Sequence, residues 1–129
     1  MGAQNSEPVA KILVIDDDRM MRELYEAILT RGGHEVVLAE NGARGLANLD
    51  QRPDLIVVDL QMADLNGYEF MKQLRSLDGG ATPVIAASGL ATGEFALRSG
   101  ADRFLQKPFH SDDLVALVNG LLAEGRSRT

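Results

Sequence analysis

Five short apolar runs alternate with longer segments of helical period, and this alternation constrains the fold more than any other feature. The runs are rich in Val, Ile and Leu and are not polar at alternate positions; they are Ile12–Ile15, Val36–Ala39, Leu55–Val58, Val84–Ala87 and Phe104–Leu105. Such runs are typical of parallel strands that are covered on both faces. Between them, apolar residues recur at helical spacing, as in Met21, Leu24 and Ile28. We therefore predict an α/β fold with a parallel sheet, right-handed crossovers and helices on both faces.

The number of strands favours one strand order. Of the two orders that are common in doubly wound sheets, the flavodoxin-like order 2-1-3-4-5 suits five strands. In this order the first and third strands are neighbours, and the direction of winding changes between them. Ligands bind outside the carboxyl ends of the strands at such a switch point. We therefore expect a site where the residues that follow these two strands meet.

Charged and polar residues follow four of the predicted strands. Asp16–Asp18 come directly after the first strand, Asp59 closes the third, Ser88 follows the fourth and Lys107 follows the fifth. Carboxylates that share a crevice repel each other, and repulsion should raise the pKa of at least one of them. Oxygen ligands suit a hard cation such as Mg²⁺, which would cancel the formal charge of −2 left by three acids and one lysine. We assign Asp18 to the start of the following helix rather than to the site.

The composition excludes several classes of protein. The net charge of −6 argues against non-specific binding of nucleic acid, which depends on clustered Lys and Arg. The chain has no cysteine, hence no disulfide framework and no thiolate site. No apolar stretch approaches the ~20 residues of a membrane span, and the first residues lack a signal-peptide core. We expect a cytoplasmic protein without membrane insertion, with a single domain at 10–124 between flexible tails at 1–9 and 125–129.

The residues at the strand ends resemble a known family. The pattern formed by Asp16-Asp17, Asp59, Ser88 and Lys107-Pro108-Phe109 is similar to that of the receiver domain of two-component response regulators. The segment Asp59–Gly67 resembles the loop after the phosphoacceptor of that family, and Gly100–Asp102 resembles its turn before the fifth strand. The resemblance extends over residues 10–124. Four strand ends that match in order and in chemistry make it specific.

The resemblance implies a reaction and a metal. Asp59 would accept a phosphoryl group from a sensor histidine kinase or a phosphotransfer protein, so the chain would be a signalling phosphoacceptor rather than an enzyme. Asp17, Asp59 and the backbone carbonyl of Gln61 would bind Mg²⁺ (or Mn²⁺) directly. Asp16 would act largely through a bound water.

The resemblance also implies how the signal leaves the site. Ser88 would bind one phosphoryl oxygen and Lys107 would pair with another. A cis peptide bond between Lys107 and Pro108 would direct the lysine into the site. Phe104, three positions before the lysine, would turn into the space that the Ser88 hydroxyl leaves when it moves toward the phosphoryl group.

Two departures from the family pattern affect these expectations. Leu90, two residues after Ser88, has no polar group to orient an attacking water, and Gln61 is the alternative candidate for that role. The stretch between Ser88 and Lys107 is shorter than in the family, and its helical core is limited to Glu94–Ser99. Short helices are marginal on their own. We predict a fourth helix of two turns or fewer.

Several functional readings stay open. No DNA-binding or enzymatic segment follows the last predicted helix, so we expect a stand-alone, chemotaxis-type receiver that signals to an unknown protein by direct contact. A pseudo-receiver that binds partners without phosphorylation is the main alternative. An aspartate-nucleophile phosphatase would use the Asp-x-Asp of Asp16 and Asp18, but the chain lacks room for a cap domain. A flavodoxin-like carrier would require a phosphate-binding loop where Asp16–Asp18 stand.

Overall fold

The computed structural model describes residues 9–62, 66–78, 81–90 and 93–127. Its five strands are β1 (Lys11–Ile15), β2 (Glu35–Ala39), β3 (Leu55–Asp59), β4 (Val84–Ser88) and β5 (Arg103–Gln106). Its helices are α1 (Arg19–Arg31), α2 (Gly42–Ala47), the 3₁₀ turn η1 (Asn48–Gln51), α3 (Gly67–Asp78), α4 (Gly93–Arg98) and α5 (Ser111–Ser127). The strands form one parallel sheet in the order β2-β1-β3-β4-β5. The predicted doubly wound α/β fold and its flavodoxin-like strand order are confirmed.

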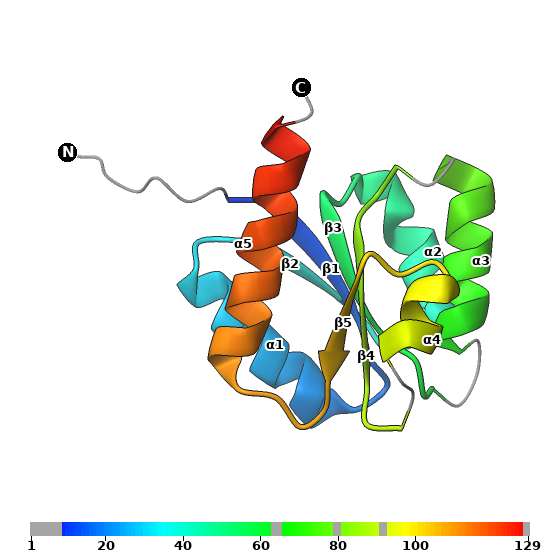
Figure 1. Cartoon of the computed structure of the whole chain (residues 1–129), viewed down its shortest axis with the longest axis horizontal. Coiled ribbons are helices and arrows are strands. Elements are labelled where there is room, and N and C mark those ends of the chain that lie inside the picture. The colour runs from blue at the N-terminus through cyan, green and yellow to red at the C-terminus, as the bar shows by residue number, and fades with distance from the viewer. Residues whose placement is uncertain (1–8, 63–65, 79–80, 91–92, 128–129) are drawn as a thin grey trace.

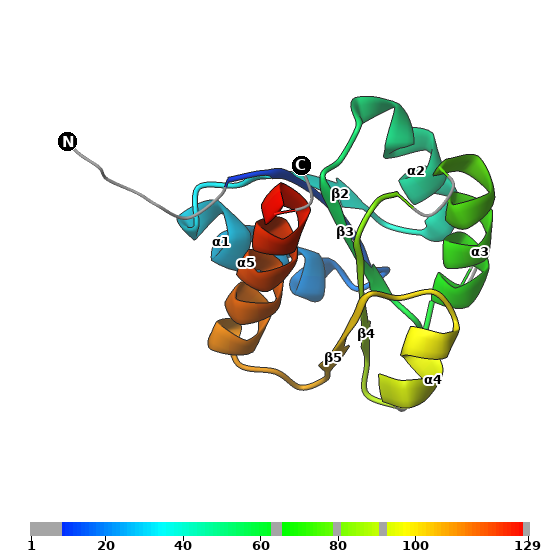
Figure 2. The ribbon, with the colours of Figure 1, turned by 45° about the horizontal axis from the view of Figure 1, so that its top comes forward.

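The sheet lies between two layers of helices (Figure 1). Helices α1 and α5 cover one face, which we call the α1/α5 face, and α2, α3 and α4 cover the other, the α2/α3/α4 face; Figure 2 shows the same division from a second direction. The central strands β3 and β4 are buried along their whole length. Both faces are therefore covered, as the continuous apolar runs predict.

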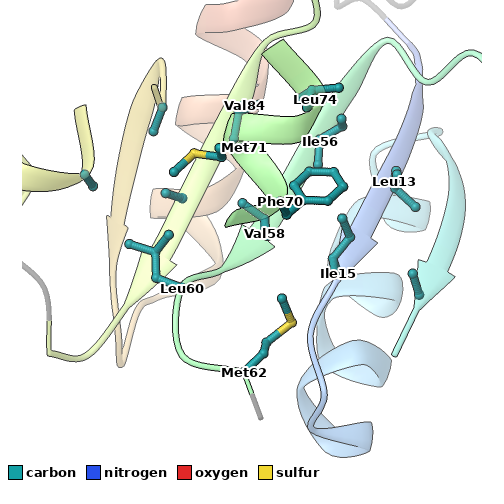
Figure 3. Close-up of a cluster of buried hydrophobic side chains, with 14 residues drawn as sticks. Leu13, Ile15, Ile56, Val58, Leu60, Met62, Phe70, Met71, Leu74 and Val84 are labelled. Carbon is teal, nitrogen blue, oxygen red and sulfur yellow. The ribbon is translucent and has the colours of Figure 1, made fainter. Parts of the chain in front are cut away.

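Each face has its own hydrophobic core. The core on the α1/α5 face joins inward side chains of the strands to Tyr25 and Leu29 of α1 and to Leu114 and Val118 of α5. In the core on the α2/α3/α4 face, Phe70 of α3 packs against strand residues, and Figure 3 shows its ring beside β3. Successive residues of a strand point to opposite faces, so the two cores take alternate positions of every central strand.

The helix boundaries agree with the signals in the sequence. Asp18 is the N-cap of α1, and its side chain accepts a hydrogen bond from the Met20 backbone N–H at 3.0 Å, as its assignment to that helix predicts. Helix α4 has six residues, which confirms the short fourth helix. Helix α5 continues to Ser127, three residues past the domain boundary that we expect at Glu124. Among the described residues, no helix combines the length and the apolar character needed to cross a membrane.

Candidate functional site

Three carboxylates meet at the carboxyl ends of β1 and β3, which are adjacent in the sheet. Asp16 is fully buried, Asp59 is 6% exposed and Asp17 is exposed. One carboxylate oxygen from each of the three lies within 4.8 Å of the others. The structure thus brings together the acids that the strand order predicts at the switch point.

Lys107 supplies the positive charge of this cluster. Its Nζ lies 3.2 Å from Asp16 Oδ2 and 3.6 Å from Asp59 Oδ2, and its side chain is mostly buried. The Lys107 backbone N–H donates to the Ser88 carbonyl at 2.9 Å, and the Lys107–Pro108 peptide bond is cis. One ammonium group therefore faces two buried carboxylates.

Asp16 is held on all sides by the protein. Its Oδ1 accepts from the Asp18 backbone N–H at 2.9 Å, while its Oδ2 faces Lys107. Its backbone N–H donates to the Ala39 carbonyl, and its own carbonyl accepts from Arg22 Nη1 at 2.8 Å. Both carboxylate oxygens of Asp16 already have donors, which leaves Asp17 and Asp59 better placed to contact a cation directly.

Burial sets the ionisation of Asp59. Loss of solvation raises the pKa of the Asp59 carboxyl group; the hydrogen bond from the Gln61 backbone N–H, at 3.1 Å, opposes this rise. The charge of Asp16 raises the pKa further, and the Lys107 ammonium lowers it. We expected repulsion to raise a carboxylate pKa, and the direction is right, but burial is the larger cause.

Tyr25 of α1 is a buried phenol whose electrostatics are coupled to the same acids. Tyr25 is 1% exposed, and its hydroxyl has no hydrogen-bond partner among the described residues. Its ring stacks on Phe109, with 5.5 Å between the ring centroids. Burial raises the pKa of Tyr25, and the charges of Asp16 and Asp59 add to the rise. The sequence places Tyr25 on a helix, but nothing in it signals a hydroxyl beside the acids.

Ser88 and Phe104 lie on the opposite face of the sheet from Asp59. Val84 and Ala86 belong to the core on the α2/α3/α4 face, so Ser88 at the next alternate position shares that face. Phe104 packs against the same core. Its ring borders Gly93, the first residue of α4, where an added Cβ would lie 3.2 Å from the ring. The two predicted switch residues thus share one face of the sheet, on the side of α4.

The side chain of Gln61 connects the two groups. Its backbone N–H binds Asp59, and its side-chain Oε1 accepts a hydrogen bond from the Ser88 hydroxyl at 2.6 Å. From the sequence we expect the backbone carbonyl of Gln61 to bind the metal and its side chain to orient a water. The contact with Ser88 joins residues 27 positions apart, and no local pattern indicates it.

A five-stranded sheet in this order, with acids and a lysine at the carboxyl ends of its strands, defines a receiver-type domain. Residues 12–119 match the response regulator receiver domain, so the chain belongs to that family. Members of this family are signalling phosphoacceptors rather than enzymes, and they imply a histidine kinase as partner. This membership sets aside the phosphatase and flavin-carrier alternatives. The acidic triad is typical of the Mg²⁺ site of receivers.

Two curated relatives match most of this chain but only about half of their own length. The transcriptional regulatory protein CpxR of Klebsiella pneumoniae is 35% identical over 113 residues, which cover 87% of this chain and 49% of CpxR. The response regulator MprA of Mycobacterium sp. (strain KMS) is 38% identical over 116 residues, covering 87% of this chain and 50% of MprA. The chain therefore spans about half the length of these relatives.

Solved receiver structures match nearly the whole chain. A CheY-like receiver domain protein from Methanospirillum hungatei has a TM-score of 0.86 at 28% identity, with 95% of this chain and 100% of that chain covered. The receiver domain of the Francisella response regulator 1452 has a TM-score of 0.83 at 32% identity, with 90% and 98% covered. Both comparisons support the fold and the family.

Proposed function

We propose that Asp59 accepts a phosphoryl group from a histidine kinase or a phosphotransfer protein in a Mg²⁺-dependent reaction, and that phosphorylation changes the protein contacts of the chain. The observation that carries this proposal is the setting of Asp59: a nearly buried carboxylate, 3.6 Å from a lysine ammonium and within 4.8 Å of two further acids. Family membership supports the donor, because receivers pair with histidine kinases.

The transfer step needs little covalent chemistry from the protein. An Asp59 carboxylate oxygen attacks phosphorus while the bond from phosphorus to the donor imidazole nitrogen breaks. The nitrogen takes the electron pair of that bond and then a proton, which leaves a neutral histidine on the donor. Positioning and charge neutralisation dominate phosphoryl transfer, and Lys107 provides a positive charge at the required place.

The acids also fit a magnesium ion. One oxygen from each of three carboxylates lies within 4.8 Å of the others, and such clustered oxygen ligands are what Mg²⁺ prefers. Asp17, Asp59 and the Gln61 carbonyl would hold the ion, and Asp16, whose oxygens already have donors, would reach it through water. When bound, Mg²⁺ would neutralise charge on the transferring group.

The response would pass to the other face of the sheet. Ser88 would turn its hydroxyl toward a phosphoryl oxygen, and Phe104 would move into the space that it leaves. Because Phe104 borders the first residue of α4, this movement would change the surface formed by α4 and β5. A downstream protein would bind to that changed surface.

Intact mass after incubation with acetyl phosphate and Mg²⁺ tests the proposal. The wild type should gain the mass of one phosphoryl group, and Asp59→Asn should not. Asp50→Asn, which alters an exposed acid of η1, is the matched control and should gain the mass as the wild type does. A wild type that gains nothing, or an Asp59→Asn variant that gains equally, would refute the proposal; the first result would favour the pseudo-receiver.

A further inference from the structure

We infer that the side chain of Gln61 opposes phosphorylation by holding the Ser88 hydroxyl in the resting state, an inference that rests on the function proposed above. The hydroxyl donates to Gln61 Oε1 at 2.6 Å and accepts from the Leu90 backbone N–H at 2.9 Å. Ser88 is fully buried, so protein groups rather than bulk water orient its hydroxyl.

The bond to Gln61 and a bond to a phosphoryl oxygen exclude each other. A serine hydroxyl has one proton to donate. While that proton points at Gln61 Oε1, it is not available to a phosphoryl oxygen. Gln61 Oε1 and a phosphoryl oxygen are both acceptors, so they compete for the single proton of the Ser88 hydroxyl. A hydrogen bond from Ser88 to a phosphoryl oxygen therefore requires the Gln61 side chain to release Ser88.

The position of Gln61 makes this release feasible. The residue is exposed, so its amide can exchange Ser88 for water. Its backbone N–H meanwhile binds Asp59 Oδ1 at 3.1 Å, which keeps the residue next to the phosphoacceptor. Gln61 is thus a positioning residue that is in contact with both Asp59 and Ser88. It links the acids on one face of the sheet to the hydroxyl on the other.

The size of the effect follows from the type of bond. A neutral hydrogen bond that is exchanged for water contributes a modest net free energy, which corresponds to roughly a threefold to tenfold change in an equilibrium constant. Removing the Gln61 amide should therefore strengthen the binding of a phosphoryl mimic by about that factor. The gain should depend on the Ser88 hydroxyl, because that hydroxyl is what the amide holds.

A double-mutant cycle tests this inference with beryllium trifluoride, a phosphoryl mimic, in the presence of Mg²⁺. Gln61→Met keeps the length of the side chain and removes its acceptor, and Ser88→Ala removes the donor. Affinity is measured by calorimetric titration of the wild type, the two single variants and the double variant. Gln73→Met, at an exposed position of α3, is the matched control for the change of residue type.

We expect Gln61→Met to bind the mimic about three to ten times more tightly than the wild type. In the Ser88→Ala background the same change should have no effect, and Gln73→Met should bind as the wild type does. Unchanged or weaker binding by Gln61→Met, or an equal gain without Ser88, would overturn the inference while leaving the proposed function intact. Failure of the wild type both to bind the mimic and to accept phosphoryl from acetyl phosphate would overturn the proposed function itself.

Discussion

The two faces of the sheet differ in their helices and in the polar residues that they carry. On the α1/α5 face, long helices of 13 and 17 residues pack over a core that extends up to Asp59 and its lysine. On the α2/α3/α4 face, α2 and α4 have six residues each, and glycines bring backbone and side chains into close contact. The charged groups lie on the face with the two long helices, whereas Ser88 and Phe104 lie on the face that carries the two short helices.

Under the proposed function, this difference would let one sheet separate phosphoryl transfer from the response. Phosphoryl transfer requires fixed geometry, which a face with extensive helix packing can provide. A response requires an element that can move at low cost, and a six-residue helix has little packing of its own to lose. Four predictions, ordered from the largest expected effect to the smallest, test this division.

Adding one methyl group to each face should have opposite effects. A Cβ on Gly67, the first residue of α3, would lie 2.5 Å from the Asp59 carbonyl oxygen and 2.8 Å from Leu60 Cα. Both are backbone atoms, so we expect Gly67→Ala to lower the free energy of unfolding by about 3 kcal/mol. Gly120 of α5 has no atom within 4 Å of an added Cβ, and Gly120→Ala should raise stability by about 0.5–1 kcal/mol. Urea denaturation of both variants measures the contrast; equal effects would contradict it.

Removing the charge of Lys107 should lower the stability of the fold. Lys107→Met leaves Asp16 and Asp59 buried without their ammonium partner. We expect a loss of about 2 kcal/mol at neutral pH, below the full cost of breaking a buried pair because the lysine is partly exposed. The loss should shrink in acid, as Asp59, whose pKa burial raises, becomes protonated. Thermal denaturation in metal-free buffer at several pH values measures it, and a loss that does not depend on pH would point to packing instead.

Exchanging a hydroxyl between the two aromatic residues compares the faces directly. The buried Tyr25 hydroxyl has no partner among the described residues, so Tyr25→Phe should stabilise the fold by about 1 kcal/mol while keeping the stack on Phe109. Phe104 is half-buried, and Phe104→Tyr should change stability by less than about 0.5 kcal/mol. Chemical denaturation of the two variants measures the difference. A destabilised Tyr25→Phe variant would show that the hydroxyl is bonded in solution.

The raised pKa of Asp59 should appear as a slope of stability against pH. Because burial raises this pKa in the folded state, the folded protein keeps the proton at pH values where the unfolded chain has lost it. Unfolding then releases a proton, so stability falls as pH rises from about 4, the ordinary pKa of Asp, through the folded pKa. Asp59→Asn should lack this contribution and gain stability over the wild type with rising pH in metal-free buffer. Denaturation midpoints from acid to neutral pH measure the slope; identical profiles would contradict it.

The sequence was sufficient to predict the parts of the molecule that depend on local pattern. Apolar runs placed the strands within about one residue of their observed bounds, because burial on both faces makes almost every position of a central strand apolar. The spacing of Glu94–Ser99 predicted the short α4, and Asp18 was recognised as a helix residue from its place after the strand. The strand order alone predicts that Asp16, Asp17 and Asp59 lie together, as they do in the structure.

Contacts between distant side chains could not be predicted in this way. The bond from Ser88 to Gln61 depends on the rotamer of an exposed amide, which no sequence period determines. The same is true of Arg22, whose guanidinium reaches the Asp16 carbonyl, and of Tyr25, whose hydroxyl is buried because its ring fills the core. Burial, the largest cause of the raised pKa of Asp59, could not be predicted either, since the depth of burial is a property of the packed fold.

The contact between Lys107 and Asp16 joins residues that are 91 positions apart in the chain. During synthesis all three acids emerge from the ribosome long before the lysine does. Contacts of such long range form late, because the chain loses the entropy of loop closure before these contacts stabilise it. A partly made chain can present the acids but not the complete charge balance of the site. Under the proposed function, a chain cannot receive a signal until its last strand, β5, and the lysine that follows it have been made.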